Sequence, residues 1–328
     1  MSENQIVHVA VGVIVNASGK ILLTKRAEGS HQGGLWEFPG GKVELNESVQ
    51  VALARELKEE LAIDVQYSEP LIKIKHNYTD KTVLLDVWLV KSFLGKAIGN
   101  EGQPLEWIGL DALSLTDDCQ YPLPDANKAI VTALQLPSRQ LVTGDHSSPS
   151  EFKNKLRRAL MSGIRFVHLR LDLEKCSVDL ANEIIKLSLE TCESYDVCLV
   201  LNSRLLDVLD SELVNIFEKH NCGIHLTSEH LNMLSSLPPI KGIIGASCHN
   251  EEELSKASAL NVDYVNISPV KETQSHPDSA VLGWESFSEM THKINVPVYA
   301  LGGLTQEDLS KVRESGGQGV AGISDFWV

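Results

Sequence analysis

Three glutamates in the first half of the chain have the spacing of a metal site. Glu56, Glu59 and Glu60 stand at positions i, i+3 and i+4, so a helix would bring their carboxylates to one face. Carboxylates at that spacing repel one another unless a cation lies among them. A hard divalent ion such as Mg²⁺ or Mn²⁺ prefers oxygen ligands and also binds phosphate groups. The pattern therefore predicts a metal site for a phosphorylated ligand, with Arg55 as a counter-charge inside the cluster.

The neighbouring residues predict how these glutamates are held. We expect a helix over residues 47–61, with Asn46 as its N-cap and an apolar stripe at four-residue steps. A glutamate-rich helix alone is more often a solvated surface. Here it follows Phe38-Pro39-Gly40-Gly41, whose paired glycines allow the backbone to approach a ligand closely, and this favours the metal site. The stripe consists of Val49, Leu53 and Leu57.

This segment resembles the 23-residue signature of the Nudix hydrolases. The match runs from Gly41 through Glu47 to Arg55-Glu56-Leu57-x-Glu59-Glu60-x-Ala62-Ile63. The family usually has glycine where this chain has Ala62, and we expect that change to shift the helix end slightly without abolishing metal binding. The resemblance extends over residues 6–134 and is closest to the MutT branch, which hydrolyses oxidised purine nucleoside triphosphates to monophosphates. Local matches to that branch are Thr24-Lys25-Arg26, His31, residues 35–41, Glu101-Gly102-Gln103-Pro104 and Pro124-Asp125-Ala126-Asn127.

The resemblance implies a role for each matching residue. Glu56 is our first candidate for the base that activates the attacking water and Glu101 is the second, with Arg55 in the same catalytic set. Arg26 is implied to contact phosphate or sugar, Phe38 to pack near the base, and His31 to belong to the substrate site. The implied ligands of Mg²⁺, or of Mn²⁺ in its place, are Glu56, Glu59, Glu60, Glu101 and the Gly40 carbonyl.

Asn127 is the residue implied to read the purine edge. A buried asparagine presents both a donor and an acceptor, so it can distinguish the carbonyl and N7–H of an oxidised guanine from unmodified guanine. Asparagine is also a favoured N-cap, and Asn127 could equally cap the helix that follows it. Both interpretations stay open at the level of sequence.

The composition excludes several classes of protein. The 328 residues fit two domains, and 44 Asp and Glu against 29 Lys and Arg leave a net charge of −15, which argues against binding a nucleic-acid polymer. Small phosphorylated ligands remain compatible, because a cation or backbone amides can offset the repulsion. No apolar run approaches the roughly 20 residues of a membrane span. Six cysteines without C-x-x-C spacing, and no signal-like N-terminus, favour a reduced, cytoplasmic protein.

The pattern of elements changes near Pro137. Residues 6–134 are rich in strands with one strong helix, whereas short β-branched runs alternate with helical stretches from residue 140 onward. Pro137 would end the helix expected over residues 126–134, so we place the domains at residues 1–136 and 140–328. For the first domain the Nudix resemblance implies an α/β/α sandwich with a mixed sheet.

The second domain has eight strand candidates, which favours a closed parallel (β/α)₈ barrel of the TIM type over a doubly wound sheet. The domain is shorter than the roughly 250 residues typical of such barrels, and it lacks a full last helix after Ile323. We therefore expect the first domain, or a second copy in a homodimer, to cover the last strand. The candidates are residues 141–144, 166–171, 198–202, 223–227, 243–247, 264–268, 296–301 and 319–323.

The loops after the last two strands of this barrel contain phosphate-binding features. Loops in these positions often bind phosphate, and here they hold Gly302, Gly303 and Ser324. A Gly-Gly pair alone is as often a tight turn. Residues 140–328 resemble the thiamine phosphate synthase superfamily, through matches distributed over residues 166–170, 201–204, 223–226, 245–253, 263–265, 268–270 and 298–304.

The chain departs from the synthases where their metal and phosphate ligands lie. Both metal-binding aspartates and both phosphate-binding lysines are replaced, for example in Asn202-Ser203-Arg204 and at Asp172. The pattern is more similar to the thiazole tautomerase (TenI-like) branch, whose proposed acid and base is a histidine after strand five, matched by His249. The resemblance implies ligand contacts for Arg170 and Asn202. A tautomerase, a sensor of a phosphorylated ligand and a structural remnant remain alternatives.

These patterns predict a Mg²⁺-dependent hydrolase that converts 8-oxo-dGTP to 8-oxo-dGMP and pyrophosphate, a reaction of nucleotide-pool sanitation and DNA repair. The barrel is expected to bind a thiazole or thiamine phosphate. A competing hypothesis takes the barrel as a sign of the substrate, so that the hydrolase acts on thiamine-pathway pyrophosphates.

Overall fold

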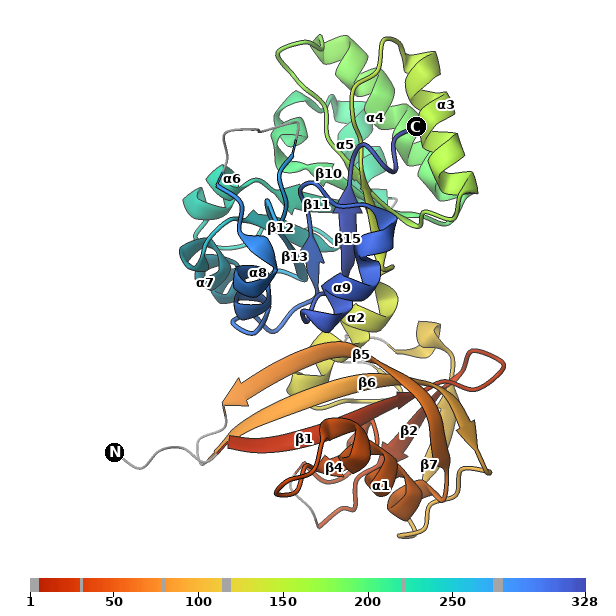
Figure 1. The fold of residues 1–328 in the computed structure, drawn as a ribbon. Coiled ribbons are helices and arrows are strands. Elements are labelled where there is room, and N and C mark those ends of the chain that lie inside the picture. Colours follow the sequence, from red (N-terminus) through yellow and green to blue (C-terminus); the bar gives the residue numbers. More distant parts are fainter. Residues whose placement is uncertain (1–5, 30–31, 78–80, 114–118, 220–221, 274–279) are drawn as a thin grey trace. The chain divides into compact units, whose positions relative to one another are not determined.

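The chain forms two compact units in the computed structural model, residues Met1–Gln135 and Leu136–Val328 (Figure 1). The structure describes residues 6–29, 32–77, 81–113, 119–219, 222–273 and 280–328. No helix within these ranges is long and apolar enough to cross a membrane. Each unit has its own core.

The first unit is built on a mixed four-stranded sheet. Its central strand β1 runs parallel to β6 and antiparallel to β4, and β5 pairs antiparallel with β6. A second, three-stranded sheet has the order β3-β2-β7. The four strands of the first sheet are β4 (Gly40–Lys42), β1 (Ile6–Ile14), β6 (Thr82–Leu94) and β5 (Asp64–Asn77), and those of the second are β3 (Trp36–Glu37), β2 (Ile21–Lys25) and β7 (Leu105–Ile108).

Helices cover both faces of the mixed sheet. Successive residues of β1 point to opposite faces, and Ala10 packs with the helix α1 (Val49–Leu61) while Val11 packs with α2 (Lys128–Gln135). Gly12 allows the close approach of α1, because a Cβ atom there would lie 3.0 Å from a methyl group of Leu57. The predicted α/β/α sandwich with a mixed sheet is confirmed.

Helix α1 begins later than the sequence predicted. Its N-cap is Ser48, whose hydroxyl accepts a hydrogen bond from the Val51 amide, and its first residue is Val49. Asn46 has a φ of +66°, a left-handed conformation, whereas an N-cap needs the extended backbone that Ser48 adopts. The predictions of a helix from residue 47 and of Asn46 as its cap were therefore wrong by two residues.

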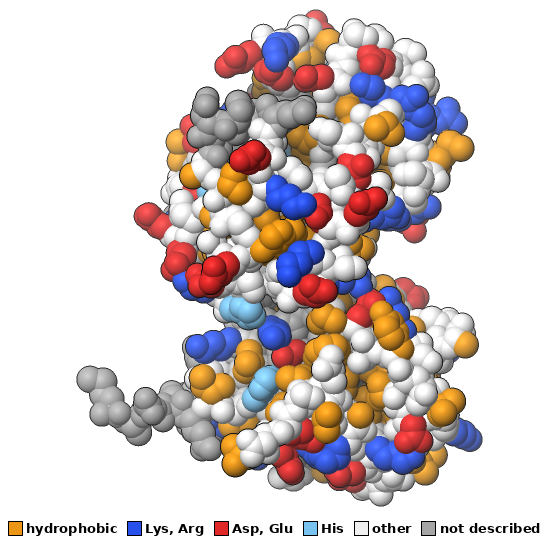
Figure 2. Space-filling model, in the orientation of Figure 1, with side chains coloured by type: hydrophobic (Ala, Val, Ile, Leu, Met, Phe, Trp, Pro, Cys, Tyr) orange, Lys and Arg blue, Asp and Glu red, His pale blue; other side chains and the backbone are white. Residues whose placement is uncertain are grey.

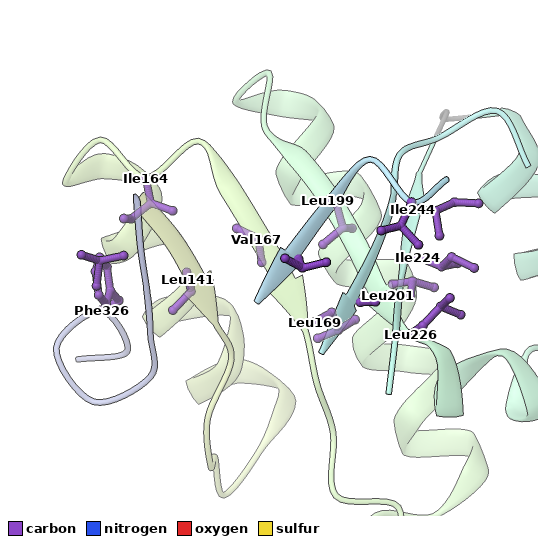
Figure 3. Close-up of a cluster of buried hydrophobic side chains, with 14 of the residues drawn as sticks. Leu141, Ile164, Val167, Leu169, Leu199, Leu201, Ile224, Leu226, Ile244 and Phe326 are labelled. Atoms are coloured by element: carbon purple, nitrogen blue, oxygen red, sulfur yellow. The ribbon is translucent and has the colours of Figure 1, made fainter. Parts of the chain in front are cut away.

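The second unit is a closed barrel of eight parallel strands, as predicted. Every strand candidate is present, with bounds that differ from the prediction by at most two residues. Figure 3 shows the leucine, isoleucine and valine side chains of these strands that form the core between barrel and helices. The strands are β8 (Arg139–Val142), β9 (Phe166–Leu169), β10 (Cys198–Asn202), β11 (Gly223–Leu226), β12 (Ile244–Cys248), β13 (Tyr264–Ile267), β14 (Val298–Ala300) and β15 (Gly319–Gly322).

Helices alternate with these strands around the barrel. The N-caps of α3, α4 and α7 are Ser148, Ser177 and Asn250. Each side chain accepts a hydrogen bond from a backbone amide in the first turn of its helix. The α-helices are α3 (Pro149–Met161), α4 (Val178–Ser194), α5 (Ser211–Lys219), α6 (Ser228–Met233), α7 (Glu251–Leu260), α8 (Gly283–Thr291) and α9 (Leu309–Glu314), and short 3₁₀ turns span Ser203–Val208 and Gln306–Asp308.

The last strand is covered from within the barrel unit. Phe326 is 3% exposed and lies over Gly322, where an added Cβ would meet its ring at 2.4 Å. Trp327 packs on Phe152 of α3, with ring centroids 4.9 Å apart, and its Nε1 donates a hydrogen bond to the Asp145 carbonyl at 3.0 Å. Aromatic residues of the final turn therefore cover this strand in place of the missing helix, and a cover from the first domain or from a second copy is not required.

Candidate active site

Arg55 holds the acidic face of α1 together. Its guanidinium donates two hydrogen bonds of 2.9 Å to the two carboxylate oxygens of Glu47 and one of 2.9 Å to Glu56. A weaker contact of 3.4 Å reaches Glu59. Hydrogen bonds to Glu47 and Glu56 raise the pKa of Arg55, so the guanidinium stays charged. The counter-charge expected from the sequence is therefore in place.

The glycines before α1 bring the backbone against the glutamates. An added Cβ on Gly41 would lie 2.1 Å from the carboxyl carbon of Glu56, so only glycine leaves room for that carboxylate. Gly40 has a φ of +150°, and a Cβ there would meet the Ala10 carbonyl at 2.1 Å. These contacts are the close backbone approach that the paired glycines predicted.

Glu60 lies in a concentration of negative charge. Burial raises the pKa of Glu60 to about 7, and repulsion from Glu101, Glu56 and Glu37 adds to this effect. A hydrogen bond from the Gly40 backbone acts in the opposite direction but does not compensate. Such an all-oxygen group with surplus negative charge suits a hard divalent cation. As they stand, no three His, Cys, Asp or Glu side chains of the described residues are arranged to hold a metal ion.

A cleft of about 270 Å³ opens beside this cluster. Its floor is apolar and comes from alternate residues of β1 and β6, which point to the same face of the sheet. Four of the predicted site residues line it: Arg26, Phe38, Gly40 and Asn127. The floor consists of Val7, Val9, Val11, Val83 and Leu85. The cleft is also lined by four residues for which the sequence predicted no role: Gln32, Glu37, Lys42 and Lys81.

Asn127 ends the 3₁₀ turn Asp125–Asn127 and is 8% exposed. Its backbone amide donates to the Pro124 carbonyl at 2.8 Å. Among the described residues its side-chain amide has no hydrogen-bond partner in the protein, so the structure shows no capping bond from it to α2. The polar atoms of this side chain are not among the fully buried atoms without a partner, so they are accessible to a ligand or to water in the cleft.

Arg26 follows β2 and forms an ion pair with Glu37 at the rim of the cleft. Burial raises the pKa of Glu37, and this effect exceeds the opposing effect of the Arg26 charge. The predicted substrate residue His31 lies outside the described residues.

A second cleft, of about 410 Å³, lies at the carboxyl ends of β14 and β15. The predicted residues Gly302, Gly303 and Ser324 line it, and both glycines have positive φ angles, +98° and +65°. One acidic residue of its lining, Asp325, accepts a hydrogen bond from the Gln306 amide at 2.9 Å. Outside the lining, Asp308 accepts a hydrogen bond from the Thr305 amide at 3.0 Å and pairs with Lys271 at 2.6 Å.

The other predicted barrel residues do not line this cleft. Arg170 is exposed directly after β9, and Asn202 ends β10, where its side-chain oxygen accepts a hydrogen bond from the Arg204 amide. His249 follows β12, and its Nδ1 lies 2.9 Å from the Glu253 carboxylate, a partner that the sequence analysis missed. A carboxylate in this position fixes the orientation of an imidazole ring.

The barrel interior contains a chain of polar side chains that the sequence analysis also missed. His225 Nδ1 lies 2.8 Å from the Tyr264 hydroxyl, and its Nε2 lies 2.9 Å from the Ser247 hydroxyl. Gln140 donates to the Tyr264 oxygen at 3.2 Å and accepts from Asn266 at 2.7 Å. Burial lowers the pKa of His225 to about 3, so this chain is neutral.

Charge of both signs is interspersed with apolar side chains on the face of each unit shown in Figure 2. On that face the net charge of −15 is therefore not gathered into one acidic surface.

Comparison with known proteins agrees with this division into two units. Residues 10–133 match the family described as NUDIX domain, and residues 140–326 match the family described as thiamine monophosphate synthase. The chain belongs to both families: its first unit is a Nudix hydrolase and its second unit is a barrel of the thiamine monophosphate synthase family.

Individual relatives each cover one unit. The 8-oxo-dGTP diphosphatase of Escherichia coli (strain K12) is 37% identical over 127 residues, which are 39% of this chain and 95% of that protein. The CTP pyrophosphohydrolase of the same organism is 39% identical over 123 residues, 38% of this chain and 87% of that protein. A protein of Aquifex aeolicus (strain VF5) named "Putative thiamine-phosphate synthase 2" is 31% identical over 198 residues, 59% of this chain and 99% of that protein.

Proposed function

We propose that the first unit hydrolyses 8-oxo-dGTP to 8-oxo-dGMP and pyrophosphate with Mg²⁺ or Mn²⁺. The observation that carries the proposal is the side-chain amide of Asn127, which lies nearly buried in the wall of the cleft without a protein partner among the described residues. Similarity to an 8-oxo-dGTP diphosphatase supports the same substrate.

The amide of Asn127 is complementary to an oxidised guanine. Its Nδ2–H can donate to the carbonyl at C6 while its Oδ1 accepts the N7–H that oxidation creates. Unmodified guanine has a bare N7, so the Oδ1 lone pairs would face another acceptor and the buried oxygen would stay unsatisfied. Phe38, 4% exposed in the same cleft, supplies an apolar surface for the base.

The acidic residues of α1 supply the chemistry. Glu56, Glu59, Glu60, Glu101 and the Gly40 carbonyl would hold the metal, which when bound neutralises charge on the phosphates. Glu56 accepts a proton from the water that attacks phosphorus, the bond from phosphorus to the bridging oxygen breaks, and pyrophosphate leaves. Arg55 orients Glu56 through their 2.9 Å hydrogen bond. Lys42, Lys81 and Arg26 add positive charge at the rim, where a triphosphate would lie.

The test compares 8-oxo-dGTP, dGTP, CTP and thiamine diphosphate at equal concentration with Mg²⁺ and the full chain. Pyrophosphate release is measured for the three triphosphates, and orthophosphate release is measured for thiamine diphosphate, whose single anhydride bond yields thiamine phosphate and orthophosphate. We expect kcat/KM for 8-oxo-dGTP to exceed that for dGTP by about two orders of magnitude, because the wrong purine leaves a buried polar group unpaired. A preference for CTP, the substrate named for a relative of similar identity, would contradict the purine-edge assignment. A preference for thiamine diphosphate would instead support a shared thiamine pathway.

We also propose that the barrel binds a thiazole or thiamine phosphate at the cleft of Gly302, Gly303 and Ser324. The size of the cleft and the two glycines with positive φ angles in its lining support this site. Calorimetric titration of the full chain with thiamine phosphate tests the proposal, with Gly303→Ala as the variant that strains the loop. Equal binding by both chains would place the ligand elsewhere, and no binding at millimolar ligand would reject the site.

A further inference from the structure

The carboxyl end of α1 is capped by a distant segment of the chain. The last carbonyl groups of a helix have no partner within the helix. Here the Leu61 carbonyl accepts a hydrogen bond from the Ile98 amide at 3.1 Å, and the Glu60 carbonyl accepts one from the Asn100 amide at 3.0 Å. The Asn100 side chain donates to the Glu59 carbonyl at 2.9 Å. Residues 98–103 therefore lie against the turn of α1 that bears the glutamates.

Gln103 joins the two acidic segments through its single amide group. Its Nε2 donates to the Glu60 carbonyl at 3.1 Å, and its Oε1 accepts a hydrogen bond from the Glu101 amide at 2.9 Å. The intervening turn is closed by a bond from the Gly102 amide to the Gly99 carbonyl at 3.0 Å. A Cβ at Gly99 would lie 2.3 Å from the Gln103 carbonyl oxygen, so this turn leaves no room for a side chain there.

These bonds hold Glu101 in an unfavourable electrostatic position. Glu101 is exposed, and it stands between Asn100 and Gln103, whose side chains bond to the Glu59 and Glu60 carbonyls of the acidic helix. A carboxylate on an unrestrained loop would move away from other carboxylates, since separation lowers their repulsion. Hydrogen bonds to the backbone on both sides of Glu101 remove that freedom.

We propose that Asn100 and Gln103 are positioning residues that hold Glu101 beside α1 and so set the divalent-metal affinity of the site. This inference rests on the metal site of the proposed function. It extends that site by two uncharged residues that carry no metal ligand themselves. Outer residues that orient ligands typically change metal affinity or activity by about 10- to 100-fold when they are replaced.

The test measures Mn²⁺ binding by electron paramagnetic resonance on the full chain without nucleotide. Gln103→Met keeps the length of the side chain and removes both hydrogen bonds, and we expect it to weaken Mn²⁺ binding about tenfold. Asn100→Ala removes one bond but keeps the backbone bond to the Glu60 carbonyl, so α1 remains capped and a several-fold loss is expected. Gln66→Met is the matched control, because within the described part of the chain the Gln66 amide bonds only to the carbonyls of Asp64 and Val65.

Two further measurements separate positioning from a general loss of structure. In Gln103→Met, amide hydrogen exchange at Glu101 should accelerate, and kcat should fall while the nucleotide KM stays within about twofold. Mn²⁺ affinity within twofold of the wild type in both variants would overturn the positioning role and leave the proposed hydrolysis standing. Weakened Mn²⁺ binding in a chain that shows no preference for 8-oxo-dGTP would keep the positioning role and reject the substrate. A wild-type chain that binds no Mn²⁺ would reject both.

Discussion

The clefts of the two units differ in how the protein treats their polar groups. In the Nudix unit, the side-chain amide of Asn127 has no protein partner among the described residues, and burial together with nearby carboxylates raises the pKa of Glu60. In the barrel cleft, the lining residue Asp325 accepts a hydrogen bond from the Gln306 backbone amide. The barrel cleft is nevertheless the larger, about 410 Å³ against 270 Å³. Unsatisfied polar groups therefore indicate a ligand more directly than volume does.

The barrel interior strengthens this contrast. TIM barrels are usually filled by branched apolar side chains, yet here a chain from Gln140 through Tyr264 and His225 to Ser247 crosses the interior. Most of its donors and acceptors are satisfied within the chain itself. Two buried atoms of the same region, Nδ1 of His168 and Oδ1 of Asn266, have no partner among the described residues.

The largest effect is expected at Glu56, where a single substitution tests whether the Nudix unit rather than the barrel contains the reaction centre. Glu56→Gln removes a charge and the candidate base while keeping the shape against Gly41, so kcat for 8-oxo-dGTP should fall by roughly a thousandfold or more. Circular dichroism and the melting temperature should stay close to those of the wild type. In the barrel, His249→Gln should leave the hydrolysis rate unchanged. Near-wild-type turnover by Glu56→Gln would reject the assignment of the acidic face as the reaction centre.

The next largest effect concerns substrate choice rather than rate. Asn127→Asp replaces the amide donor by a second acceptor, so the ratio of kcat/KM for 8-oxo-dGTP to that for dGTP should fall by about a hundredfold. Asn215→Asp, at an exposed asparagine of the barrel whose amide bonds to the Ser211 carbonyl, is the matched control. If both variants keep the wild-type ratio of kcat/KM values, Asn127 does not contact the base. The unpartnered amide of Asn127 would then no longer distinguish the Nudix cleft from the barrel cleft as a ligand site.

Glu60 makes the stability of the metal-free chain depend on pH. The folded pKa of Glu60, about 7, lies above the ordinary 4.5, so the metal-free chain loses stability as the pH rises through that interval. Glu60→Gln lacks this loss and should be more stable than the wild type by about 2 kcal/mol at pH 8, with little difference at pH 4. Urea unfolding of the full chain with chelator measures both values. Glu59→Gln, at a side chain that is 60% exposed, is the control.

If Glu59→Gln raises the free energy of unfolding at pH 8 as much as Glu60→Gln does, the cause is the change in net charge and not the burial of Glu60. Divalent metal should remove the advantage of Glu60→Gln, because the bound ion favours the ionised carboxylate of the wild type. If added Mg²⁺ leaves the difference at pH 8 unchanged, Glu60 is not near the bound ion.

The parts of the fold that could be predicted from sequence are those with local or periodic patterns. The barrel strands are short runs that are apolar on both faces, and α1 has apolar residues at helical spacing, so both were predictable. The start of α1 was missed because Asn46 and Ser48 are both good caps, and only the backbone distinguishes them. The placement of Glu101 depends on bonds from residues 98–103 to α1 about 40 residues earlier, and no local pattern encodes such a contact.

The same reasoning applies to the interior of the barrel and to the clefts. Gln140, His225 and Tyr264 are each unremarkable in sequence, and they form a chain only when closure of the barrel brings their strands together. The pairing of Asp308 with Lys271 was equally hidden, because it depends on two loops that meet at the end of the barrel. Individual residue types predicted which residues would line the clefts, but not which polar groups the protein itself would satisfy.

The smallest predicted effect concerns Ala62, the one departure from the Nudix signature. Ala62 ends α1 with a φ of +58°, a left-handed conformation that favours glycine. Ala62→Gly should therefore stabilise the chain by about 1 kcal/mol in urea unfolding, since the left-handed backbone costs a residue with a Cβ roughly that amount. Asn261, which ends α7 at a φ of +57°, is a matched control, because asparagine tolerates this conformation and Asn261→Gly should gain less. If Ala62→Gly and Asn261→Gly raise the free energy of unfolding equally, glycine stabilises both left-handed helix ends regardless of the residue it replaces. A loss at Ala62 would mean that its methyl group makes contacts worth more than the strain, and the helix end beside the glutamates would then be set by packing.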